Sequence, residues 1–115
     1  MPTLEDIQVK LKRFVRQRDW EQYHSPKNLA MALAGEAAEI LEIFQWLTEE
    51  QSRKLGREDL EALKDELADT FIYLLEIAGS FQIDLLAAVQ NKIRKNTLKY
   101  PREKAKGSAK KYTRL

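Results

Sequence analysis

Residues 65–79 read DELADTFIYLLEIAG, the most apolar stretch in a chain of 115 residues of which 43% are hydrophobic and 33% charged. The apolar side chains recur at helical spacing, and Gly79 is a candidate stop signal for the helix. They point in nearly every direction around the helix axis, so more than one face needs a partner. The stretch therefore predicts a central helix that packs inside its own chain and against a second subunit.

The flanking sequence predicts more helices and no strand. Capping signals recur along the chain, and those at Thr3, Ser25 and Asp84 are followed by apolar residues at helical spacing. No segment alternates as a half-buried strand would, and no glycine-rich phosphate loop or repeat is present. We predict an all-α bundle of four to five helices. The first should start after Thr3, three long ones should span residues 26–47, 58–78 and 85–99, and a short turn should follow Thr48 and end near Gly56.

Composition limits the class of protein and its compartment. The chain has no cysteine, which excludes disulfides and thiolate metal sites. No apolar run approaches the ~20 residues of a membrane-spanning helix, and the opening MPTLEDIQ lacks the build of a secretory signal. We expect one domain over residues 1–101, a cytoplasmic location and no membrane partner.

The C-terminal segment, residues 102–115, is basic. It holds six Lys or Arg and one Glu, a net charge of +5 against +2 for the whole chain, so the body is acidic. Three interpretations stand at this point: a solvated and partly disordered terminus, a tail docked on an anionic site, and an arm for RNA.

Four carboxylates stand in two pairs with a spacing of three residues. Glu36 and Glu39 lie in GEAAEILEIFQW, residues 35–46, and Glu66 and Asp69 lie in the apolar stretch. Residues three apart share a helix face, and Asp69 is expected to have little solvent around it. Such pairs often simply face water, but poorly solvated like charges are costly unless a cation neutralises them.

The available ligands indicate which cation would fit. All candidates are oxygen donors and His24 is the only histidine, which favours Mg²⁺, or Mn²⁺, over Zn²⁺. A di-iron bundle would need Glu-x-x-His motifs, and the chain has none. Mg²⁺ commonly shares its ligand shell with substrate phosphates. Glu42 continues the spacing and is expected to meet solvent or a salt bridge.

Longer motifs carry a family resemblance. RDWEQYH (residues 18–24), SPKNLAMALAGEAAEILEIFQW (residues 25–46), DELADTFIYLL (residues 65–75) and NTLKYP with GSAKKYT (residues 96–101 and 107–113) are similar to segments of one family. They resemble the all-α nucleoside triphosphate pyrophosphohydrolases of the MazG-like superfamily, and within it the dCTP pyrophosphatases. The similarity spans nearly the whole chain.

The resemblance implies an Mg²⁺-dependent hydrolase that cleaves between the α- and β-phosphates of dCTP or a related nucleotide, in a homotetramer whose docked tail is part of the assembly. It implies metal ligands at Glu36, Glu39, Glu66 and Asp69. From the chemistry, we expect one of Glu36 and Glu39 to serve as general base, because the cluster holds it in reach of the attacking water. The implied substrate-binding residues are Trp20, Glu21, Gln22, His24, Trp46, Tyr73, Lys92 and Asn96.

Other interpretations remain open from the residues alone. Trp20 and Trp46 would ordinarily be core residues, and Tyr73 and Lys92 could be a core and a surface residue. The alternative function is a helical interaction or RNA-binding module that uses the basic tail. We expect no nucleic-acid partner, because the tail itself shares the family resemblance.

Overall fold

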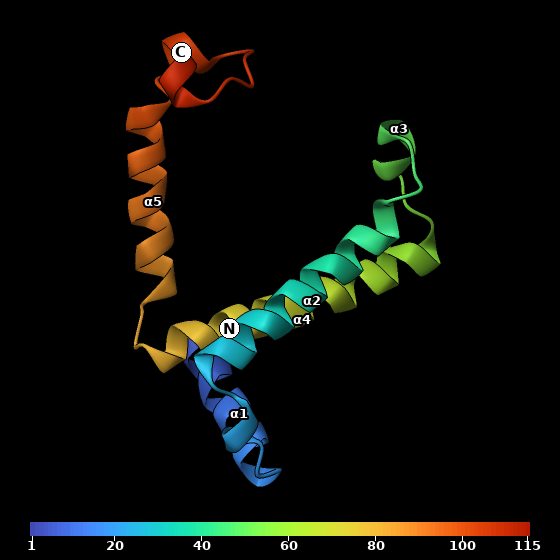
Figure 1. Ribbon diagram of the computed structural model, residues 1–115, viewed down its shortest axis with the longest axis vertical. Helices are drawn as coiled ribbons and strands as arrows, with labels where there is room; N and C mark the ends of the chain where they lie inside the picture. Colours follow the sequence, from blue (N-terminus) through green and yellow to red (C-terminus); the bar gives the residue numbers. More distant parts are fainter. The chain divides into compact units, whose positions relative to one another are not determined.

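The computed structural model describes residues 1–115, and all of its regular secondary structure is helical, which confirms the all-α prediction (Figure 1). The chain forms two compact units, residues 1–82 and 83–115. From the sequence we expected a domain over residues 1–101 followed by a basic segment. The first unit contains α1 (Leu4–Gln17), the 3₁₀ turn η1 (Glu21–Tyr23), α2 (Pro26–Phe44), α3 (Glu49–Ser52) and α4 (Arg57–Ser80). The second contains α5 (Leu85–Lys99), α6 (Arg102–Ala105) and the 3₁₀ turn η2 (Tyr112–Arg114).

The predicted capping residues start four of the helices. Thr3 forms a capping box with Asp6 at α1, and Thr48 forms one with Gln51 at α3. Side-chain oxygens of Ser25 and Asp84 accept from the backbone N–H three residues on, at α2 and α5. These bonds satisfy N–H groups that a helix start otherwise leaves without partners.

Two helix ends differ from the prediction. α2 stops at Phe44 instead of near Leu47, because the backbone turns there and the Leu47 N–H bonds to the Phe44 carbonyl at 2.9 Å. α4 passes through Gly79 and ends at Ser80, because the left-handed backbone conformation that ends it falls on Gln82, with φ of 55°. The prediction that Gly79 ends this helix was therefore wrong.

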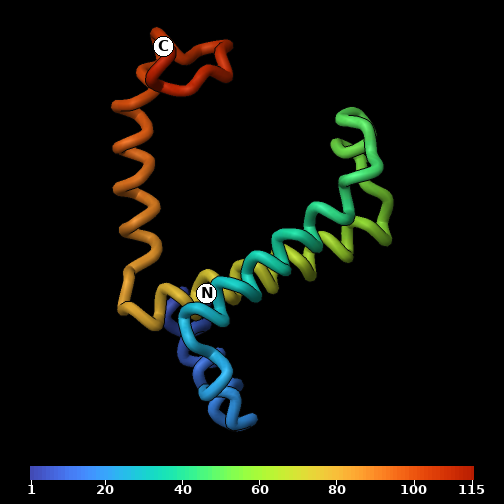
Figure 2. Tube along the Cα trace, in the orientation of Figure 1, coloured from blue at the N-terminus to red at the C-terminus, as the bar shows by residue number.

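The core of the first unit lies where α2 and α4 run side by side in opposite directions and α1 meets α4 (Figure 2). Val15, Leu29, Leu75 and Ala78 are its buried apolar residues. One polar contact also ties α1 to α4, since Gln8 Nε2 donates to the Leu75 carbonyl at 3.1 Å. These contacts fix the α2–α4 pair on which the candidate site is built.

Much apolar surface has no partner within its own unit. α4 leaves four large apolar side chains exposed, and α5 has no buried residue at all. This agrees with the expectation that α4 needs a second partner surface. The exposed apolar residues of these two helices are Leu60, Leu67, Phe71, Leu74, Leu86, Val89, Ile93 and Leu98.

Inside the second unit the basic segment folds back on the end of α5. The Tyr112 ring meets the Tyr100 ring edge-on, with ring centroids 5.9 Å apart, and Lys99 Nζ lies 4.9 Å from the Tyr112 ring centre.

No single helix combines the length and apolar character needed to cross a membrane. α4 and α5 pass that test only when counted together, by length and composition alone.

Candidate metal centre

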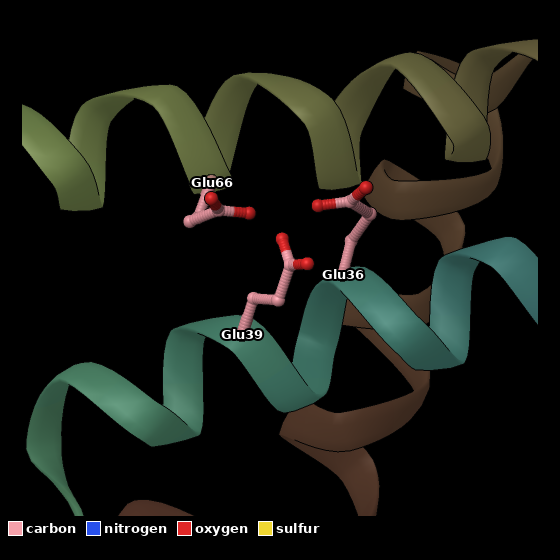
Figure 3. Close-up of side chains that lie close together, drawn as sticks. All are labelled: Glu36, Glu39 and Glu66. Atoms are coloured by element: carbon pink, nitrogen blue, oxygen red, sulfur yellow. The ribbon is translucent and has the colours of Figure 1, made fainter.

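Three of the four predicted carboxylates converge between α2 and α4. Glu36 and Glu39 project from α2 toward Glu66 on α4, and their carboxylate groups face one another (Figure 3). One oxygen from each lies within 4.8 Å of those from the other two. The spacing of three residues on α2 and the antiparallel packing of α4 produce this convergence.

The three carboxylates of the cluster repel one another when they are ionised. Hydrogen bonding of its carboxyl to Glu39 and then to Glu36, followed by burial and the two neighbouring charges, raises the pKa of Glu66 to about 8. The pKa of Glu36 is also raised. The hydrogen bond to Glu66 lowers it, but burial and then Glu39 and Asp69 together raise it by more. Without a cation, the site therefore favours holding a proton over holding three negative charges.

The donor set fits a hard divalent cation. When the three glutamates are ionised, Oε2 of Glu36 and Oε2 of Glu66 are buried with no hydrogen-bond donor. Buried charged oxygens normally have partners, and carboxylate oxygens are the ligands that Mg²⁺ and Mn²⁺ prefer. Glu36, Glu39 and Glu66 together can hold such an ion.

Asp69 and Glu42 stand beside the cluster. Asp69 is exposed, so the expectation that it has little solvent around it is wrong for the single chain, although its charge raises the pKa of both Glu36 and Tyr73. Glu42 is exposed as expected. An open hollow of about 490 Å³ adjoins the cluster, with walls of Glu39, Glu42, Ile43, Asp59, Ala62 and Glu66.

Trp20 and His24 form an aromatic platform just before the start of α2. Their rings stack with centroids 6.5 Å apart and an interplanar angle of 27°. Phe14 meets the Trp20 ring edge-on at 5.8 Å. Trp20 is 43% exposed, so it is not an ordinary core residue of this chain. An exposed aromatic face of this kind can stack on a flat base.

Trp46 lies beyond the other end of α2 and is 87% exposed. The 19 residues of α2 span about 27 Å, so Trp20 and Trp46 of one chain cannot sandwich the same base. Tyr73 lies on α4 between these ends and is half-buried. Burial, followed by the charges of the surrounding carboxylates, raises its pKa.

The remaining predicted residues lie at the surface. Glu21 is in η1, 3.9 Å from Arg16 Nε, and Gln22 Nε2 donates to the Asp19 carbonyl at 3.0 Å. Lys92 and Asn96 are exposed on α5, four residues apart on one helix face.

Sequence reasoning missed Glu76. Its side chain is 13% exposed, and its Oε2 lies 3.2 Å from His24 Nδ1. The spacing held a signal, since Glu66, Asp69, Tyr73 and Glu76 follow one another at i, i+3, i+7 and i+10 on one helix face.

Comparison with known proteins identifies relatives over nearly the whole chain. The profile of the MazG-like family matches residues 32–115. The chain is 44% identical to dCTP pyrophosphatase 1 of Homo sapiens and of Mus musculus, over 99% of this chain and 68% of each relative. It also resembles the crystal structure of a pyrophosphatase from Archaeoglobus fulgidus, with a TM-score of 0.76 and 38% identity over 88% of this chain and 94% of that one.

Proposed function

Because this chain belongs to the MazG-like family, we propose that it is a nucleoside triphosphate pyrophosphatase acting on dCTP or a related nucleotide. Water adds across the anhydride between the α- and β-phosphates, and the products are the monophosphate and pyrophosphate. The observation that carries the proposal is the convergence of Glu36, Glu39 and Glu66 in a chain similar to dCTP pyrophosphatases. Such an enzyme would remove unwanted nucleotides from the pool.

Glu36, Glu39 and Glu66 would hold Mg²⁺, with Asp69 as the fourth acidic ligand. A bound Mg²⁺ would neutralise phosphate charge and polarise the P–O bond that breaks. Either Glu36 or Glu39 takes a proton from the attacking water, since both carboxylates stand in the cluster and can act as a base. The raised pKa of Glu66 means that this carboxyl must release a proton before it binds the cation.

The base would stack on the aromatic platform of Trp20 and His24, beside Glu21 and Gln22 of η1. Tyr73 faces the nucleotide from α4, between this platform and the carboxylates. Lys92 and Asn96 would contact the phosphates. Base–aromatic stacking is worth about 1–3 kcal/mol per base, which is enough to orient a substrate whose phosphates are already held.

The assembly would be a homotetramer. Its subunits would bury the apolar faces of α4 and α5 that the chain leaves exposed. Because Trp46 lies at the opposite end of α2 from Trp20, Trp46 of the partner subunit would complete a base site. The basic segment 102–115 would dock on a neighbouring subunit near the phosphates.

A panel of nucleoside triphosphates with Mg²⁺ tests the reaction. The expected result is release of pyrophosphate, seen by ³¹P NMR, with the highest kcat/KM for a cytosine deoxynucleotide. Release of orthophosphate, or no hydrolysis of any triphosphate, would contradict the proposal. The Glu39→Gln variant is the matched negative control, because it removes one cluster carboxylate and keeps the side-chain shape.

Sedimentation tests the assembly, and a chain truncated after Pro101 tests the docked segment. A monomer at micromolar concentration argues against the tetramer. A truncated protein with unchanged KM and stability argues against docking.

A further inference from the structure

Glu76 is a buried carboxyl that the proposed reaction does not use. Its side chain is 13% exposed on α4, it is flanked by the buried Leu75 and the half-buried Ile77, and its Oε2 has no well-aligned hydrogen-bond donor. Burial raises its pKa, and the neighbouring His24 offsets part of that rise. A carboxyl is costly in such a place unless it has a partner, so its contact with His24 needs an explanation.

That contact reaches the aromatic platform. His24 Nδ1 lies 3.2 Å from Glu76 Oε2, and the same imidazole stacks on Trp20. His24 comes directly after η1, and its backbone N–H donates to the Glu21 carbonyl at 3.2 Å. A carboxylate 3.2 Å from one ring nitrogen restrains the orientation of the imidazole.

Glu76 also lies on the helix face that carries the candidate metal ligands. Glu66, Asp69, Tyr73 and Glu76 follow the i, i+3, i+7, i+10 stripe, so Glu76 is about 15 Å beyond Glu66 along α4. Tyr73 lies between Asp69 and Glu76 on this stripe, and burial, followed by the charges of Glu36 and Glu76, raises its pKa. A nucleoside triphosphate with its phosphates at the cluster, extended along this stripe, brings its base to the Glu76 end.

We propose that Glu76 is a positioning residue of the nucleotide site, which holds the His24 ring against Trp20 so that the base adds to a rigid aromatic stack. The inference rests on the proposed function. It adds a residue on α4 that acts through His24 and touches neither the phosphates nor the cluster.

Steady-state kinetics of Glu76→Leu and Glu76→Gln test the role. Glu76→Leu should raise KM for the preferred triphosphate about tenfold while kcat stays within about twofold, because the base loses its ordered platform and the phosphate end is unchanged. Glu76→Gln keeps a polar side chain of the same shape beside Nδ1 and should stay within about threefold of wild-type KM. The matched control is Glu61→Gln, which removes an exposed carboxylate of α4 paired with Lys64.

A fall in kcat at unchanged KM, or wild-type kinetics in Glu76→Leu, would overturn the proposal. Thermal melting accompanies the kinetics. If Glu76 were purely structural, Glu76→Leu would move the melting temperature and leave KM unchanged.

A second measurement does not depend on catalysis. In a Trp46→Phe background Trp20 is the only tryptophan, and acrylamide quenching of its fluorescence reports how well the ring is held. Glu76→Leu should increase the quenching constant at least about twofold, and Glu61→Gln should not change it. If the wild type hydrolyses no triphosphate, the proposed function fails while increased quenching still supports the positioning role. Unchanged quenching overturns that role whatever the activity.

Discussion

Replacing Trp46 by alanine separates a base-stacking residue from a core residue. Trp46 is 87% exposed, so about one-eighth of a side chain of roughly 250 Å², or about 30 Å², is covered by its own chain. At about 25 cal/mol per Å², its removal should cost the folded chain about 0.8 kcal/mol. A buried tryptophan would cost about 3–5 kcal/mol. The main loss should therefore appear in kcat/KM for nucleoside triphosphates.

The assay combines urea unfolding with steady-state kinetics at low temperature. Trp46→Phe is the control, because it keeps an aromatic face and should retain most of the activity. Unfolding at two protein concentrations separates a loss of assembly from a loss of fold, since only the former depends on concentration. The reasoning is refuted if Trp46→Ala loses 3 kcal/mol or more at every concentration and keeps near-normal kinetics.

Further expectations concern the cluster and one glycine. Glu39→Gln and Asp69→Asn should each abolish hydrolysis and leave the circular dichroism spectrum unchanged. Glu39→Gln should also melt at the wild-type temperature or higher, because it relieves repulsion between the carboxylates. Wild-type turnover of either variant with Mg²⁺ would contradict the metal-site assignment. The folded-state pKa of Glu66 is about 8 against an ordinary 4.5, so between these values the folded chain holds a proton that the unfolded chain has released. Without metal, the free energy of unfolding should then fall as pH rises through this window, and Glu66→Gln should flatten the fall. Melting temperatures measured without Mg²⁺ that rise toward pH 8 would contradict it. Gly79→Ala should raise the free energy of unfolding in urea by about 0.5–1 kcal/mol, because Gly79 is helical and an added Cβ meets only Gln8 Nε2, at 3.5 Å. Destabilisation would show that another surface packs against Gly79.

The fold was predictable where local chemistry decides it. Thr3, Ser25, Thr48 and Asp84 offer side-chain oxygens to free backbone N–H groups, and each starts a helix as predicted. Helix ends depend more on tertiary contacts. Gly79 stays helical where Gln8 bonds the Leu75 carbonyl one turn earlier, and a contact across 67 residues leaves no mark in local sequence.

The site was predictable in part for a similar reason. The spacing of Glu36 and Glu39 fixes a shared face, and the structure brings both to Glu66. The solvation of Asp69 could not be deduced, because it depends on what covers α4 and not on its small neighbours in sequence. Glu76 escaped notice because its partner, His24, lies in a distant connection, although its helix register matched that of the other acids.

The sparse attachment of α1 has a consequence for motion. Val15 is its only buried residue, and one side-chain bond from Gln8 adds to its hold on α4, whereas α2 and α4 pack on each other more extensively. Helices with few buried contacts open locally at a lower free energy than the rest of the protein. Amide hydrogens of α1 should therefore exchange with solvent before those of α2 and α4. Each such opening also withdraws Phe14 from the edge of Trp20, so the rigidity of the aromatic platform fluctuates with the docking of the first helix.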